Sequence, residues 1–222
     1  MSTIPLRKLI LGSTSPYRRA LLDRLHLRYS VESPQVDETP LPNERPEDLA
    51  WRLALAKAQA VAKRFPDCVV IGSDQVADLE GQALGKPGDH ARAVAQLRHM
   101  SGKTVVFQTA VAVVCLETGF CQQSLAPVRV RFRTLCDEEI ENYLQLEQPY
   151  DCAGSAKSEG LGIALLDSIE SDDPTERTPP ALQKFCQVVQ ERFTGNLTFK
   201  LWRSFLEYEK CDDSIAVIGD YR

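Results

Sequence analysis

A short loop near the start of the chain combines small hydroxyl side chains with two adjacent arginines. The loop reads Gly12-Ser13-Thr14-Ser15-Pro16-Tyr17-Arg18-Arg19 and separates an apolar run from a helical pattern. Such a loop offers free backbone N–H groups at the positive end of a helix, and arginine forks suit phosphate oxygens. The loop therefore favours a phosphate site, although paired arginines more often form a solvated face.

A single acidic residue follows a second apolar run. Asp74 lies in the stretch Gly72-Ser73-Asp74-Gln75, directly after the apolar run 68–71. Ligands of open α/β sheets bind at the carboxyl ends of strands. This carboxylate is therefore placed to bind a divalent metal or to take a proton from an attacking water. The alternative is an aspartate that only caps a helix or closes a turn.

Two lysines complete a cationic set that would suit a triphosphate. Lys86 lies between Gly85 and Pro87, which restrict its backbone, and Lys57 lies within a helical pattern. Each is an ordinary surface lysine when considered alone. Their contribution depends on a fold that brings them to Asp74 and to the arginine loop.

The elements that would position these residues alternate between strands and helices. Apolar patterning predicts strands at 8–11, 29–33, 68–71, 104–115, 125–132 and 163–166. It predicts helices from Pro16 and over 46–64, 91–100, 137–146 and 180–192. The two longest strands flank a Thr118-Gly119 turn and should pair antiparallel. This order is α/β, and it predicts a mixed, twisted sheet flanked by helices.

Composition narrows the class of protein. The 222 residues carry a formal net charge of −5, which disfavours a general nucleic-acid binder because such proteins usually present a basic face. The seven cysteines form no CxxC pair, and the three histidines have no zinc-ligand spacing. No apolar stretch approaches the roughly 20 residues of a membrane span. We therefore expect a cytoplasmic protein with free thiols and no membrane partner.

Five ordered motifs resemble those of the Maf family of nucleotide pyrophosphatases. They are STSPYRRALL (13–22), VDET (36–39), IGSDQ (71–75), GKP (85–87) and AGSAKSEG (153–160). The resemblance implies an inosine-triphosphatase-like fold with two lobes around a central cleft. It also implies a divalent metal requirement, Mg²⁺ or Mn²⁺, and it suggests a homodimer.

The resemblance also assigns roles to individual residues. Asp74 takes the family's proton-acceptor position, and Glu38 is expected to share metal binding with it. The remaining polar residues take the substrate-binding positions; they are Ser13, Arg18, Arg19, Lys57 and Lys86.

Three further positions distinguish two branches of the family. Tyr17, Gln75 and Glu159 resemble the branch that hydrolyses 7-methyl-GTP rather than the branch that hydrolyses dTTP and UTP. A carboxylate such as Glu159 can accept two parallel N–H donors from guanine, and an aromatic face such as Tyr17 attracts a base made cationic by methylation. The alternative for Tyr17 is simple packing on its helix.

The expected reaction converts 7-methyl-GTP to 7-methyl-GMP and pyrophosphate, which would keep modified nucleotides out of nucleic acids. A dTTP/UTP-type Maf pyrophosphatase is the alternative within the enzyme class. A non-catalytic nucleotide-binding regulator of cell division is the alternative outside it. The proton-acceptor position of Asp74 argues against the regulator, because binding alone needs no proton acceptor.

The end of the chain departs from the family pattern. After Asp172-Asp173-Pro174 the sequence continues as Thr175-Glu176-Arg177 instead of an apolar residue and Gly-Leu-Pro. We expect a Maf-like domain at 1–193 and an atypical extension at 194–222. Residues 176–222 are either a genuine extension or the product of a shifted reading frame.

Overall fold

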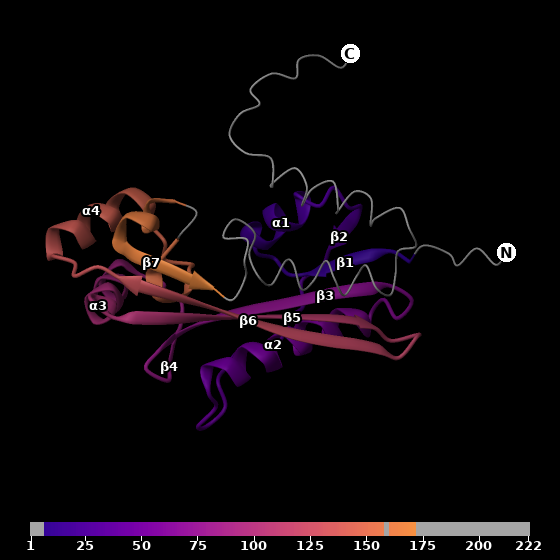
Figure 1. Ribbon diagram of the computed structural model, residues 1–222. Helices are drawn as coiled ribbons and strands as arrows, with labels where there is room; N and C mark the ends of the chain where they lie inside the picture. The colour runs from indigo at the N-terminus through magenta and orange to yellow at the C-terminus, as the bar shows by residue number, and fades with distance from the viewer. Residues whose placement is uncertain (1–6, 158–159, 172–222) are drawn as a thin grey trace, which may run out of the picture.

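The computed structural model describes residues 7–157 and 160–171, which build a seven-stranded mixed sheet flanked by helices (Figure 1). The strand order is β2-β1-β3-β5-β6-β7, with β4 paired to β3. The central strand β3 (Val69–Leu79) pairs parallel to β1 (Leu9–Gly12), which in turn pairs parallel to β2 (Tyr29–Val31). The antiparallel strands are β4 (Gln82–Leu84), β5 (Thr104–Cys115), β6 (Phe120–Phe132) and β7 (Leu166–Ser171). The predicted α/β class with a mixed sheet is confirmed.

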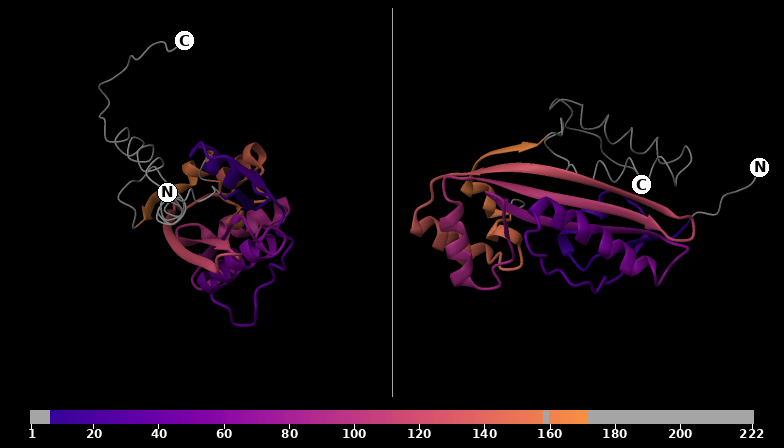
Figure 2. Two further views of the ribbon diagram at one scale, coloured as in Figure 1. Left: turned by 90° about the vertical axis from the view of Figure 1, so that its right-hand side faces the viewer. Right: turned by 90° about the horizontal axis from the view of Figure 1, so that it is seen from below.

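Helices cover both faces of the sheet. Successive side chains of β3 point to opposite faces, so Val70 packs with α2 (Pro46–Ala62) while Ile71 packs with α1 (Pro16–Asp23). At the other end of the sheet lie α3 (His90–Met100), α4 (Asp137–Glu147) and the 3₁₀ turns η1 (Ala153–Ser155) and η2 (Leu161–Leu165), as Figures 1 and 2 show. Within the described ranges, no helix has the length and apolar character needed to cross a membrane.

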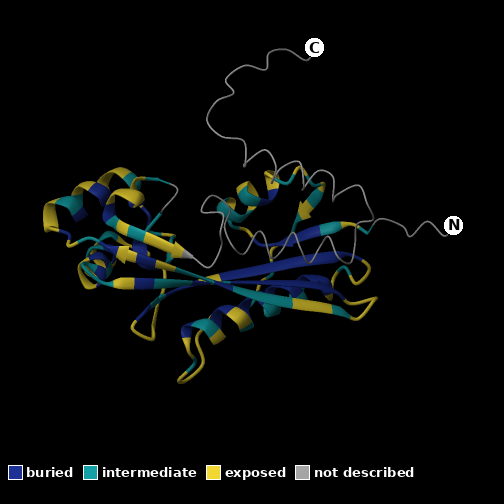
Figure 3. Cartoon of the chain, in the orientation of Figure 1, coloured by how far each residue is buried: buried dark blue, intermediate teal, exposed yellow. Residues whose placement is uncertain are grey.

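The core divides into two ends that share the long strands. At one end, α1 and α2 pack on the first half of β3. At the other, Ala77 and Leu79 of the same strand pack with Leu97 of α3 and Leu144 of α4. Figure 3 shows that β3 is buried along most of its length. The two lobes implied by the resemblance are therefore present, and the cleft between them stays a prediction.

Two predicted strands that adjoin functional motifs, 68–71 and 163–166, have different bounds in the structure. Strand β3 does not stop at Ile71 but continues to Leu79, because its backbone stays paired with β5 through Asp74↔Ala110. Polar side chains interrupt the apolar pattern there without interrupting the hydrogen-bond ladder. Residues 161–165 form η2 rather than a strand, and the last strand follows at Leu166–Ser171. The predicted helix at 180–192 and the domain boundary at 193 lie outside the described residues.

One contact of small residues sets how close α2 lies to the sheet. Gly72 of β3 faces α2, and a Cβ atom there would overlap the carbonyl oxygen of Ala54 and lie 2.5 Å from the amide nitrogen of Ala58. Both alanines are completely buried. Because the neighbours are backbone atoms, no side-chain rotation could make room.

Replacing this glycine should therefore push the helix away from the sheet. We expect Gly72→Ala to lower the free energy of unfolding by about 1–3 kcal/mol, the usual cost of overpacking a core, as measured by urea denaturation. Gly85→Ala is the matched control, because nothing lies within 4 Å of a Cβ at that position. Equal stability of the two variants would contradict this account of the contact.

Candidate active site

A buried lysine joins the two carboxylates that the sequence singled out. The Lys57 ammonium lies 2.6 Å from Asp74 Oδ1 and 2.8 Å from Glu38 Oε1. The side chains of Lys57 and Asp74 are only 6% and 9% exposed, whereas that of Glu38 is 52% exposed. A buried ion pair of this kind requires close geometry to offset the loss of hydration. The exposed Glu38 marks the side from which a ligand can approach.

The loop between β1 and α1 lies against this cluster. Ser15 caps α1 by accepting a hydrogen bond from the Arg18 amide (3.4 Å), with Pro16 in the first turn. The buried hydroxyl of Ser13 accepts hydrogen bonds from the Ser15 amide (3.2 Å) and from Arg18 Nη1 (3.3 Å). These bonds turn the Arg18 side chain back over the loop. The start of α1, with its positive dipole end, therefore opens beside a fixed guanidinium.

The charges of the cluster perturb one another. Burial raises the pKa of Asp74 above its ordinary value, and the repulsion of Glu38 adds to this, while Lys57 and Arg18 oppose the rise. Burial lowers the pKa of Arg18, and the carboxylates of Asp74 and Glu38 oppose that change. A carboxylate whose pKa is raised binds a proton more readily, which is the property that a general base requires.

Asp74 occupies a different place in its strand from the one predicted. It was expected at the carboxyl end of a strand, but it lies within β3. The neighbouring strand β1, however, ends at Gly12, which pairs with Gly72. Asp74 therefore lies just beyond the carboxyl end of β1, where the loop to α1 begins. The site still forms at a strand end, but the strand is β1 rather than β3.

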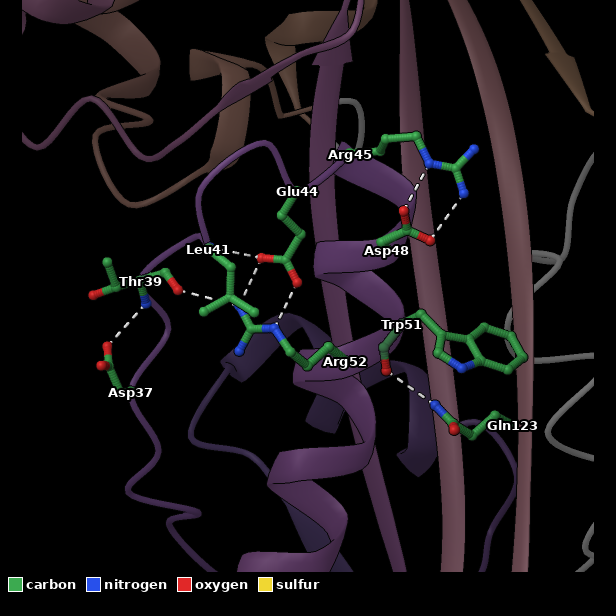
Figure 4. Close-up of polar contacts among 9 residues, drawn as sticks. All are labelled: Asp37, Thr39, Leu41, Glu44, Arg45, Asp48, Trp51, Arg52 and Gln123. Carbon is green, nitrogen blue, oxygen red and sulfur yellow. Dashed lines mark hydrogen bonds and ion pairs between the residues drawn. The ribbon is translucent and has the colours of Figure 1, made fainter.

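The segment that carries Glu38 is attached to α2 by an arginine. Arg52 donates hydrogen bonds to both oxygens of Glu44 (2.6 and 2.8 Å) and to the carbonyl oxygen of Thr39 (3.1 Å), as Figure 4 shows. Asp37 accepts a hydrogen bond from the Thr39 amide (2.9 Å). Arg52 was not among the residues predicted from the sequence. The only signal available was its position on the same helix as Lys57.

The burial of Lys57 was also missed, although the sequence held a signal for it. Lys57 lies four residues after Leu53 and four before Val61, and both of these side chains are buried against the sheet. Positions four apart share one face of a helix. A lysine within that apolar stripe must reach a buried partner, and it reaches Asp74.

Tyr17 contacts the late glycine-rich segment. The Cys152 thiol donates a hydrogen bond to its hydroxyl (3.8 Å), and the Lys157 ammonium lies 5.7 Å from the centre of its ring. Burial, together with the Cys152 contact, raises the pKa of Tyr17 to about 12. Lys157 is itself paired with Glu147 (2.7 Å). Tyr17 thus lies next to the segment that carries the third predicted specificity residue.

The other predicted residues lie outside this network of contacts. Gln75 is exposed and donates a hydrogen bond to Thr109 Oγ1 (2.8 Å) on the next strand. Arg19 and Lys86 are exposed, and within residues 7–157 and 160–171 the hydrogen bonds and ion pairs of Asp74 involve neither of them. Glu159 lies outside the described residues.

Comparison with known proteins agrees with this arrangement of motifs. The family model described as Maf-like protein matches residues 8–176. A protein of Polaromonas sp. (strain JS666) named 7-methyl-GTP pyrophosphatase is 71% identical over 184 residues, which cover 83% of this chain and 84% of that protein. A protein of the same name from Albidiferax ferrireducens is 66% identical over 184 residues, covering 83% and 92%. The solved Staphylococcus aureus Ham1 protein is 14% identical with a TM-score of 0.45, over 91% of this chain and 100% of that one. With the family match spanning most of the chain, and these relatives sharing well over half of their residues with it, this protein belongs to the Maf-like family.

Proposed function

We propose that this chain hydrolyses 7-methyl-GTP to 7-methyl-GMP and pyrophosphate, and so keeps the modified nucleotide out of nucleic acids. The observation that carries the proposal is the buried Asp74 carboxylate beside Lys57, Glu38 and Arg18. Phosphoryl transfer to water needs a general base, positive charge around the phosphates and access for the substrate. Asp74 would supply the base, and Lys57 and Arg18 would supply the charge. The substrate follows from the names of the relatives at 71% and 66% identity.

In the proposed reaction Asp74 accepts a proton from water. The water oxygen bonds to the α-phosphorus, the bond from that phosphorus to the bridging oxygen breaks, and pyrophosphate leaves with the electron pair. Among the described residues, the hydrogen bonds to Asp74 use only Oδ1, which receives Lys57. Oδ2 is therefore the oxygen that we assign as proton acceptor. Arg18 and Lys57 stabilise the negative charge that develops on the phosphate oxygens.

The carboxylates fit a divalent cation, Mg²⁺ or Mn²⁺. Glu38 and Asp74 already converge on a single positive charge, the Lys57 ammonium. No group of three or more His, Cys, Asp or Glu suited to a metal occurs within the described ranges. Mg²⁺ is commonly held by one or two carboxylates together with substrate phosphates, so two protein ligands suffice. When bound, the cation would neutralise phosphate charge, and we propose Glu38 and Asp74 as its ligands.

Recognition of the base is assigned to Tyr17, Gln75 and Glu159. The Lys157 ammonium already lies over the Tyr17 ring, so this ring accepts cations on its face. A base that is cationic through methylation would gain from the same attraction. We propose the carboxylate of Glu159 as the acceptor for the guanine N–H groups. We place this activity in the cytoplasm, where the cysteines would remain thiols.

A nucleotide panel tests the proposal. Purified protein with Mg²⁺ or Mn²⁺ should release pyrophosphate from 7-methyl-GTP in preference to GTP, dTTP, UTP and ITP. Omission of the metal or addition of a chelator should abolish the release. A preference for dTTP or UTP would reject the substrate while retaining the reaction. No release from a folded sample would reject both.

Removing the proton acceptor should stop turnover without unfolding the chain. We expect Asp74→Asn to lower kcat by about 10²–10⁴-fold, the usual contribution of a general base, with an unchanged circular dichroism spectrum. Asp78→Asn is the matched control on the same strand. Its Oδ1 accepts a hydrogen bond from the Gly81 amide (2.8 Å), which an asparagine also accepts, and its Oδ2 accepts from Gln108 Nε2 (3.5 Å), where an asparagine amide can donate instead to Gln108 Oε1. Near-normal turnover by Asp74→Asn would reject the role of Asp74.

The specificity carboxylate should act on substrate choice more than on rate. Glu159→Gln keeps the shape but replaces one acceptor by a donor, so guanine would lose a parallel pair of hydrogen bonds. We expect the ratio of kcat/KM for 7-methyl-GTP over UTP to fall by about tenfold, given about 1–3 kcal/mol for an unpaired buried group. An unchanged ratio across the nucleotide panel would remove Glu159 from base recognition.

A further inference from the structure

The ion pair between Arg52 and Glu44 differs from an ordinary surface pair. The Glu44 side chain is only 7% exposed, and both of its oxygens bind the Arg52 fork at 2.6 and 2.8 Å. Hydrogen bonding to Arg52 lowers the pKa of Glu44 to about 2. Such bidentate pairs fix geometry as well as charge.

The pair connects helix α2 to the backbone next to Glu38. Arg52 Nη2 also donates to the carbonyl oxygen of Thr39 (3.1 Å), the residue that follows Glu38. At the other end of the segment, Glu44 Oε2 accepts a hydrogen bond from the Leu41 amide (2.9 Å). Figure 4 shows the whole connection between the loop and the helix. The segment 39–44 is thus attached to α2 at two points by one guanidinium.

The same helix carries Lys57, which binds the Glu38 carboxylate at 2.8 Å and the Asp74 carboxylate at 2.6 Å. Glu38 is otherwise exposed and lies in a segment without helix or strand. A long exposed side chain on an unsupported loop would sample many positions. Lys57 alone cannot prevent this, because a single ammonium attracts a carboxylate without fixing its direction.

We propose that Arg52 and Glu44 act as positioning residues that hold Glu38 over Lys57 and Asp74, although neither touches the reacting atoms. This role rests on the proposed function, in which Glu38 helps to bind the cation. An arginine is needed because only its planar fork reaches Glu44 and Thr39 at once. The chain provides a control in Arg45, which also forms a bidentate pair, with Asp48 (2.7 and 3.0 Å), but is 67% exposed.

The experiment compares Arg52→Ala, Arg52→Lys and Glu44→Gln with Arg45→Ala. Amide hydrogen exchange reports on the loop without any need for turnover. We expect the Leu41 amide to exchange about tenfold faster or more in the first three variants, because its acceptor is no longer held. Arg45→Ala should leave it unchanged. An unchanged Leu41 amide in Arg52→Ala would overturn the proposal.

Measurements of kcat and KM distinguish a positioning role of Arg52 from a direct effect of its positive charge. If Arg52 holds Glu38, kcat should fall about tenfold or more in Arg52→Lys and also in Glu44→Gln, while KM changes less than about threefold. If Arg52 acted only through its positive charge, Arg52→Lys would retain activity and Glu44→Gln would not lose it. Either of those results would overturn the proposal.

The proposed function and the positioning role of Arg52 and Glu44 can be rejected independently of each other. An unmodified protein that does not hydrolyse 7-methyl-GTP would reject the proposed function, and the exchange of the Leu41 amide would still decide whether the loop is held. Mn²⁺ titration of the substrate-free protein provides the link to Glu38. Arg52→Ala should weaken Mn²⁺ binding about as much as Glu38→Gln does, and full Mn²⁺ affinity in Arg52→Ala would overturn the positioning role.

Discussion

The close approach of α2 to β3 is the constraint on which the site depends. Gly72 has no side chain, and Ala54 and Ala58 are small, so helix and strand backbones come into direct contact. Lys57 precedes Ala58 and can therefore reach Asp74, two residues beyond Gly72 on the same face of the strand. A wider separation would break this buried ion pair, which costs several kcal/mol. Packing of the core therefore also brings Lys57 and Asp74 together.

This arrangement explains why β3 tolerates polar residues along a buried strand. The ladder to β5 satisfies the backbone of Gly72 and Asp74 regardless of their side chains. Strand β1 ends at Gly12, so the surface beyond it is free of a parallel neighbour. The loop to α1 fills that place and brings Ser13 and Arg18 to the carboxylate. The end of one short strand therefore makes room for the loop that brings Arg18 to Asp74.

The parts of the candidate site that lie close together along the chain could be predicted from the sequence. The order of strand, loop and helix around Pro16 was predicted correctly, because the turn before Pro16 and the capping by Ser15 are local properties. The extent of β3 was not predicted, because pairing with β5 is a long-range interaction that overrides the local polar pattern. The contacts of Arg52 were missed for a similar reason. A guanidinium on a helix gives no sign in sequence of which loop it will bind.

The positive and negative charges of the cluster are equal in number. Lys57 and Arg18 balance Asp74 and Glu38, so two positive and two negative groups meet beside the loop. A triphosphate adds several negative charges to a cluster that is already neutral, and these need further positive charge. Arg19 and Lys86 are exposed, and within the described part of the chain neither forms an ion pair with Asp74, so both side chains could supply that charge. A divalent cation on Glu38 and Asp74 would supply the rest, which is the physical reason for including one in the proposed function.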